Sequence, residues 1–297
     1  MKTTLEALLS TGKPIVADGA MGTMLFELGL EQGHAPELWN VEQPDKVRRV
    51  YRGYIEAGSQ IILTNSFGGT RIRLEMHGLG DRVAELNRAA AALARQEADA
   101  APGPVVVAGS MGPTGQMLAP YGLISFEEAA AAFEEQARAL VEGGVDVLWI
   151  ETMSDLNEVR AAVEGCERAA PGFPRVTTMT FDTNGRTMMG VTPEQAIEAL
   201  AGMGVLALGG NCGKGPDELE IVLQKMRAVS PDSILIAKAN AGLPHMVEGK
   251  PVYDATPEVM AEFAVRLREA GATIIGACCG STPDHIRAIA DILHQTE

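Results

Sequence analysis

Two cysteines are adjacent in the segment GACCGSTPDHIR, residues 276–287, of a chain that contains only four. Cys278 and Cys279 follow a short apolar run, and Cys212 follows another in the segment GGNCGKGP. Three thiols brought together can bind zinc as thiolates, with a Zn–S distance of about 2.3 Å. A disulfide and a pair of packing residues are the alternatives for the adjacent cysteines. The fourth cysteine, Cys166, lies inside a helix-length segment, and we expect it to be a packing residue.

The fourth position of such a zinc site decides its chemistry. A structural site fills that position with another cysteine or a histidine. None of the five histidines ends a predicted strand, so we expect the position to stay open for a substrate. Zinc with three thiolates carries a net charge of about −1, which suits the binding of an added thiol and its deprotonation near neutral pH. The reaction class that this favours is alkyl transfer to a thiol by in-line attack.

Two acidic residues stand where other predicted strands end. Asp18 ends the first apolar run and Glu151 ends the fourth. Either carboxylate could accept hydrogen bonds from the ammonium group of an amino-acid thiol. The alternative for each is a carboxylate that bonds backbone amides. Backbone amides near Gly19 are candidates for holding a substrate carboxylate.

The composition of the chain excludes several classes of protein. Its 297 residues include 46% hydrophobic and 21% charged residues, which argues against disorder. The net charge of −15 disfavours binding to nucleic acid or to an anionic membrane surface. The N-terminal segment has no apolar run typical of a signal peptide, and no segment is apolar over a membrane-spanning length. We therefore expect a cytoplasmic protein with reduced thiols, which disfavours the disulfide.

Eight short apolar runs alternate with eight helix-length segments along the chain. This order predicts an α/β fold of the (βα)8 or TIM-barrel type, as a single domain over residues 1–297. A doubly wound open sheet is the alternative, but DGAMGTM after the first run does not match its G-x-G-x-x-G signature. The strand-like runs begin at Pro14, Gln60, Pro104, Asp146, Arg175, Val205, Ile234 and Thr273. The helical segments are Asp45–Ala57, Arg82–Ala98, Phe126–Glu142, Asn157–Ala169, Pro193–Ala201, Asp217–Val229, Pro257–Ala270 and Pro283–Leu293.

A barrel of this kind brings the ends of its strands together at one rim, where active sites form. Cys212 ends the sixth run and the cysteine pair ends the eighth, so their thiols are expected to converge. Adjacent residues on a regular strand point to opposite faces. Both thiols of the pair can face one ion only if the backbone leaves strand geometry, which Gly280 and the helix start at Thr282 permit.

Seven segments resemble the homocysteine S-methyltransferase family, in particular the homocysteine-binding module of cobalamin-dependent methionine synthases. They are DGAMGTML, TNSFGGTRIRL, GSMGPTG, WIETMSDLNEVRAA, GGNCGKGP, KANAGLP and GACCGSTPDHIRAIA. The resemblance covers the whole chain and implies a (βα)8 barrel with zinc on Cys212, Cys278 and Cys279. Homocysteine would then bind as a zinc thiolate.

The same resemblance implies roles for four further residues. Asp18 and Glu151 match the family's contacts to the homocysteine amino group, and Gly19 supplies backbone near its carboxylate. Asn240, in KANAGLP, matches a residue that occupies the fourth zinc position when substrate is absent.

The expected activity is methylation of homocysteine to methionine, with a methylcorrinoid (methylcobalamin) protein or domain as the donor and partner. Methionine synthases also carry folate, cobalamin and activation domains, which these 297 residues do not contain, so we expect either a fragment of such an enzyme or a chain that works with separate corrinoid and donor proteins. A small donor such as S-methylmethionine or betaine, or another thiol acceptor, is the first alternative. Thr152 and Gly68–Gly69 stand where betaine-dependent relatives have aromatic residues, and the chain has only 4% aromatic residues, which disfavours betaine. A zinc-stabilised interaction subunit without catalysis is the second alternative.

Overall fold

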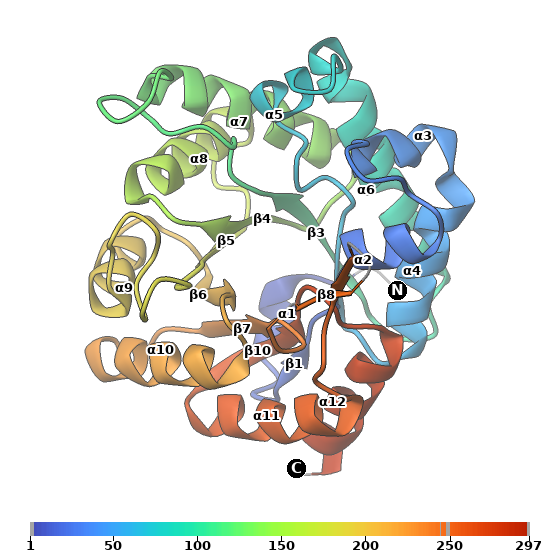
Figure 1. Ribbon diagram of the computed structural model, residues 1–297, viewed down its shortest axis with the longest axis vertical. Helices are drawn as coiled ribbons and strands as arrows, with labels where there is room; N and C mark the ends of the chain where they lie inside the picture. The colour runs from blue at the N-terminus through green and yellow to red at the C-terminus, as the bar shows by residue number, and fades with distance from the viewer. Residues whose placement is uncertain (1–2, 244, 248–249, 296–297) are drawn as a thin grey trace.

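Eight parallel strands form a ring in the computed structural model, which describes residues 3–243, 245–247 and 250–295 (Figure 1). The order around the ring is β1-β10-β7-β6-β5-β4-β3-β2, and every pairing is parallel. A parallel bridge between Ala17 and Ile61 joins the two ends of this order. The (βα)8 prediction is therefore confirmed, and the open doubly wound sheet is excluded. The strands are β1 (Ile15–Val16), β2 (Ile61–Leu63), β3 (Val106–Met111), β4 (Val147–Met153), β5 (Arg175–Met179), β6 (Ala207–Cys212), β7 (Leu235–Ala239) and β10 (Ala272–Ala277).

One long helix follows each strand and packs on the outside of the ring (Figure 1). The predicted start signals are in place, since Thr192 and Thr256 cap helices that begin with proline. Gly144 ends another helix in the left-handed region, at φ +98°. All eight predicted helices lie close to their expected bounds. They are α4 (Pro44–Glu56), α6 (Val83–Ala100), α7 (Phe126–Gly143), α8 (Leu156–Ala169), α9 (Pro193–Ala201), α10 (Pro216–Val229), α11 (Pro257–Glu269) and α12 (Pro283–Gln295).

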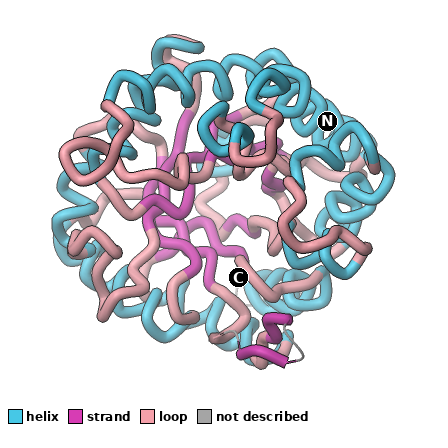
Figure 2. The backbone as a smooth tube through the Cα atoms, turned by 45° about the horizontal axis from the view of Figure 1, so that its top comes forward, coloured by secondary structure: helices cyan, strands magenta, loops and turns pink. Residues whose placement is uncertain are grey.

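Several short elements lie outside the eightfold repeat and carried no clear sequence signal. Leu5 and Leu8 of α1 join the cluster of side chains inside the ring. The antiparallel pair β8–β9 lies between β7 and α11 and stands apart from the ring (Figure 2). These elements are α1 (Leu5–Leu9), α2 (Gly22–Glu27), η1 (Pro36–Leu38), α3 (Trp39–Glu42), α5 (Arg71–Glu75), η2 (Gly80–Arg82), β8 (His245–Val247) and β9 (Lys250–Val252).

The inside of the ring is apolar in its lower layers and polar at the carboxyl ends of the strands. Trp149 of β4 and Ile236 of β7 belong to the apolar interior. Side chains two positions apart on a strand share a face, so Glu151 and Lys238 come next on the same inner face. This change from apolar to polar side chains forms the floor of the site described below.

Two of the sequence expectations reach beyond the described residues. Residues 1–2 and 296–297 end the predicted domain, and Pro244 ends the KANAGLP segment; all lie outside the described part of the chain. Among the helices of the described residues, none has the length and apolar character needed to cross a membrane.

Candidate metal and substrate site

A cavity of ≈ 590 Å³ opens at the carboxyl ends of the strands, where barrel enzymes place their active sites. Six of the seven residues singled out from the sequence line it. These are Asp18, Gly19, Glu151, Cys212, Cys278 and Cys279. The seventh, Asn240, does not line the cavity but lies directly behind the cysteines. The cavity therefore gathers residues that are widely separated in sequence into one place.

The three predicted thiols converge on the cavity wall. The Sγ atoms of Cys212, Cys278 and Cys279 all lie within 4.8 Å of one another, and those of Cys212 and Cys278 are 2.8 Å apart. Three sulfurs bound to one tetrahedral zinc would lie about 3.8 Å apart. The Sγ atoms of Cys212 and Cys278 would therefore need to move only slightly apart to hold the ion. No other group of histidine, cysteine or acidic side chains in the described ranges has this arrangement. The residues present fit a zinc ion.

The backbone turns immediately after β10, so that both adjacent cysteines face the same point. The N–H of Cys278 still donates to the carbonyl oxygen of Ala239, at 2.7 Å. Gly280 then takes a φ of +81°, and a side chain there would meet the ring of Tyr253 at 2.1 Å. This confirms the predicted departure from strand geometry.

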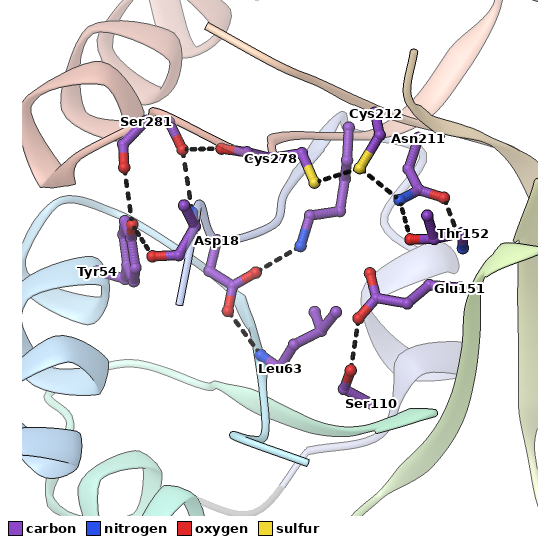
Figure 3. Close-up of polar contacts among 12 residues, drawn as sticks. Asp18, Tyr54, Leu63, Ser110, Glu151, Thr152, Asn211, Cys212, Cys278 and Ser281 are labelled. Atoms are coloured by element: carbon purple, nitrogen blue, oxygen red, sulfur yellow. Dashed lines mark hydrogen bonds and ion pairs between the residues drawn. The ribbon is translucent and has the colours of Figure 1, made fainter. Parts of the chain in front are cut away.

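Cys212 has a strained backbone conformation, and the side-chain amide of Asn211 contacts its sulfur. Its φ is +58° and that of Thr152 is +62°, both unusual for residues with side chains. The buried Asn211 accepts hydrogen bonds from the Thr152 N–H at 2.9 Å and the Thr178 hydroxyl at 2.7 Å. Its amide nitrogen lies 2.7 Å from the Thr152 hydroxyl and 3.3 Å from the Cys212 sulfur (Figure 3). Asn211 thus joins three strands beneath the thiol, a role that sequence reasoning did not find.

Asn240 links the loops that carry the cysteines. Its Oδ1 atom accepts the N–H of Cys279 at 3.0 Å, and its Nδ2 atom donates to the carbonyl oxygen of Gly213 at 2.8 Å. Gly213 directly follows Cys212 in the chain. The side chain therefore supports both halves of the thiol cluster from behind.

Lys238 is the main feature of the site that sequence reasoning missed. It lies in KANAGLP, a segment that was singled out for its asparagine, and its side chain is only 3% exposed. Its Nζ atom is 2.7 Å from Asp18 Oδ1, while Asp18 Oδ2 accepts the N–H of Leu63 at 2.6 Å. Burial alone would lower the pKa of Lys238, but Asp18 and Glu151 raise it above its usual value. The lysine is therefore a buried cation between carboxylates.

Glu151 faces the cavity beside the thiols and is 7% exposed. The hydroxyl of Ser110 donates to its Oε1 atom, and Oε2 has no hydrogen-bond partner in the described part of the chain (Figure 3). Burial raises the pKa of Glu151 to about 7, against the opposing effect of Lys238. The carboxyl group can therefore change its charge near neutral pH.

Three aromatic side chains line the same cavity, which the sequence argument against an aromatic cage did not foresee. Phe26 and Phe67 are partly exposed, and Tyr253 lies next to Gly280. Phe67 directly precedes Gly68–Gly69, the pair at which the sequence predicts no aromatic side chain for a cage. The cavity thus has aromatic faces despite the small number of aromatic residues in the chain.

The remaining cysteine and a buried histidine have structural contacts. Cys166 is fully buried in the core, which raises its pKa to about 12 and confirms the packing prediction. His285 is 8% exposed, and its Nδ1 atom accepts the Thr282 N–H at 3.1 Å. Its Nε2 atom is 2.9 Å from the carbonyl oxygen of Ala255. The contact with Thr282 places the imidazole at the start of α12, where it caps the helix.

A closed (βα)8 barrel with three convergent thiols at the catalytic rim defines a class of barrel enzymes built around a thiol cluster. Within that class, the chain belongs to the homocysteine S-methyltransferase family, whose sequence profile matches residues 15–293. The members of this family are methyltransferases that act on homocysteine.

Named relatives agree with this assignment. The chain is 34% identical to the methionine synthases of Mycobacterium leprae (strain TN) and Mycobacterium tuberculosis (strain ATCC 25618 / H37Rv), over 93% of its own length. It spans 24% of the length of each of these relatives. Among solved structures, the metallated form of the homocysteine methyltransferase MmuM from Escherichia coli is 27% identical, with a TM-score of 0.81. That similarity covers 97% of this chain and 99% of the MmuM chain.

Proposed function

We propose that the protein binds zinc through Cys212, Cys278 and Cys279 and methylates homocysteine to methionine. The observation that carries the proposal is the cluster of three sulfur atoms within 4.8 Å on the wall of a cavity that also holds Glu151. The metallated form of MmuM, a structural neighbour over nearly the whole chain, supports a metal at this site. A cytoplasmic location, where thiols stay reduced, is part of the proposal.

Zinc held by three thiolates would supply a fourth position for the substrate sulfur and keep that sulfur deprotonated. The chain's own residues would orient the rest of the substrate. Asp18 and Glu151 place negative charge on the cavity wall for the ammonium group, and Gly19 places backbone beside the substrate carboxylate.

Asn240 remains our proposed ligand of the fourth position in the absence of substrate. Its Oδ1 atom already accepts the Cys279 N–H, and an amide oxygen has a second lone pair. An ion could use that lone pair without breaking the contact that supports the cysteine loop.

The methyl donor that we propose is a methylcorrinoid, carried by a partner protein or domain. Support comes from the similarity to two methionine synthases, of which the chain matches about a quarter. A small cationic donor is the second candidate, and the specific observation in its favour is the set of aromatic faces from Phe26, Phe67 and Tyr253. Such faces attract sulfonium and quaternary ammonium groups, as in S-methylmethionine and betaine.

A panel of methyl donors tests these proposals with zinc-loaded protein and free homocysteine. We expect methionine to form with methylcobalamin. Turnover with S-methylmethionine or betaine alone would instead identify the methyl donor as a small cationic compound. The Cys212→Ala variant should lose both zinc and turnover. Cys166→Ala is the matched control, because it removes a buried thiol outside the cavity and should keep its zinc. Zinc binding without turnover on any donor would refute the catalytic proposal and favour an interaction subunit.

A further inference from the structure

Arg73 is a cation on the cavity wall that the proposed handling of homocysteine does not use. It lies on α5, is half-buried and lines the cavity. Among the residues that the structure describes, its guanidinium group has no ion pair and no hydrogen bond. A planar guanidinium group is suited to paired hydrogen bonds with a carboxylate. Arg73 is therefore available to bind an anionic group of a ligand.

The loop that follows β3 leaves room for Arg73 and for the aromatic ring of Phe67. A side chain at Gly112 would lie 2.5 Å from Cε2 of Phe67, and one at Gly115 would collide with Nη1 of Arg73. Gly68 leaves room for the stem of the arginine, since a Cβ atom there would lie 3.1 Å from Arg73 Cγ. The glycines of the β3 loop thus let an aromatic ring and a guanidinium group reach the cavity together.

The β3 loop lies across the mouth of the cavity from the cysteines. In the order of strands around the ring, β3 stands opposite β7 (Figure 1). β7 lies between β6 and β10, the two strands whose carboxyl ends carry the thiols. The cavity of ≈ 590 Å³ joins both sides and has the volume of a pocket for a drug-sized ligand. A small amino acid at the thiols therefore leaves the side of Arg73 for a second ligand.

Glu37 is an acidic side chain on the same wall. It is 5% exposed, and its Oε1 atom accepts the N–H of Gly68 at 2.6 Å. Burial raises the pKa of Glu37, against the opposing effects of backbone hydrogen bonds and of the charges of His77 and Arg73. Within the described ranges no ion pair joins Glu37 to Arg73. Glu37 is therefore not a partner that would block the guanidinium group.

We propose that Arg73 anchors the carboxylate of a small zwitterionic methyl donor, whose methylated onium group lies against Phe26 and Phe67. Both rings line the cavity, and aromatic faces attract sulfonium and quaternary ammonium groups. A donor held at both ends presents its methyl group across the cavity to the thiols. This inference rests on the proposed function through its second donor, the small cationic compound. It does not require the methylcorrinoid to be inactive.

The step that this position serves is a methyl transfer between two sulfur atoms when the donor is S-methylmethionine. The deprotonated sulfur of homocysteine forms a bond to the methyl carbon, and the bond between that carbon and the sulfonium sulfur breaks. The electron pair of the broken bond stays with the donor sulfur, which becomes a neutral thioether. Two molecules of methionine result, and the proton of the homocysteine thiol is released to the solvent.

Two donors that differ only at the carboxylate test the anchor. S-methylmethionine and its carboxamide are compared by kcat/KM on zinc-loaded protein saturated with homocysteine. We expect the wild-type protein to prefer the carboxylate about tenfold or more, because a hydrogen-bonded charge is lost in the amide. Arg73→Met should bring this preference close to one, and Arg73→Lys should restore part of it. A preference that Arg73→Met leaves intact would overturn the inference.

Two controls distinguish an anchor from a general effect of charge or structure. Arg49→Met removes an exposed positive charge on α4 outside the cavity and should keep the wild-type preference. An equal loss of preference in Arg49→Met would refute the anchor. The dissociation constant of homocysteine should be the same in Arg73→Met as in wild type, since Arg73 lies across the cavity from the thiols. A weakened affinity for homocysteine would assign Arg73 to the other ligand and contradict the inference.

Binding data separate this inference from the proposed function. If neither donor is turned over, calorimetric titration of the homocysteine-saturated protein gives the same preference as a ratio of dissociation constants, because no reaction consumes the donor. Absence of binding by both compounds would overturn the inference and leave methylation by methylcobalamin intact. Absence of homocysteine binding would overturn the proposed function, and the inference with it.

Discussion

Replacement of Glu151 by glutamine is expected to make the zinc-free protein more stable at alkaline pH and a poorer binder of substrate. Burial raises the pKa of Glu151 from 4.5 to about 7, which corresponds to about 3 kcal/mol. Between pH 4.5 and about pH 7, the Glu151 carboxyl group has lost its proton in the unfolded chain, whereas it keeps the proton in the folded protein. The stability of the wild-type protein therefore falls as the pH rises through this window, and the loss is complete above about pH 7. Glutamine has nearly the same size as glutamate and does not ionise, so the Glu151→Gln variant does not lose this stability as the pH rises.

The free energy of unfolding in urea, measured on reduced, zinc-free protein from about pH 5 to about pH 8, checks this prediction. The stability gain of Glu151→Gln over wild type should be small at the acidic end and approach about 3 kcal/mol at the alkaline end. The exposed Glu198 on α9 offers a matched control for the exchange of glutamate by glutamine away from the cavity. A Glu151→Gln difference that stays constant over the range would refute the reasoning.

Three further predictions concern the packing and the thiols of the site. Gly19→Ala should cost about 1–3 kcal/mol in urea unfolding, because its Cβ atom would lie 2.5 Å from Ser281 Oγ; unchanged stability would contradict this. Asn211→Ala should weaken zinc binding about 10–100-fold in competition with a chelator, and an unchanged affinity would exclude its supporting role. A mild thiol oxidant should join Cys212 and Cys278 in the zinc-free protein, because their sulfurs lie 2.8 Å apart. Bound zinc should protect both thiols from this oxidation. Mass spectrometry of peptides would identify the cysteines that are joined, and a pairing other than Cys212 with Cys278 would contradict the prediction.

The eight repeats were predictable because each helix and each buried strand has its own local signal. Capping residues such as Thr192 and Thr256 mark helix starts, and glycine marks the ends. Strands buried on both faces read as apolar runs, so their order alone predicts the ring. Short elements such as α1 and the β8–β9 pair depend on contacts with the rest of the barrel, and their sequences gave no comparable signal.

The convergence of the thiols was also predictable, because strand ends meet at one rim of a barrel. The side-chain contacts that support the site were not predictable from the sequence. Asn211 stands beside Cys212 in the sequence, but its contacts reach β4 and β5. Lys238 and Asp18 are joined across 220 positions of the chain, and a lysine within an apolar run gives no indication of its partner. Phe67 directly precedes Gly68–Gly69 in the sequence, and only the folded loop brings its ring to the cavity.

X-ray absorption at the zinc edge is the most direct test of the central claim, that three cysteines hold zinc with a position open to the substrate sulfur. The account predicts about three sulfur ligands for the zinc-loaded protein alone and one more after homocysteine is added. The thiol 4-mercaptobutanoate, which lacks the α-amino group of homocysteine, should also add a sulfur ligand at saturating concentration. Glu151 affects the affinity for the substrate and does not bind the zinc ion. A sulfur count that does not change when homocysteine is bound would contradict the account.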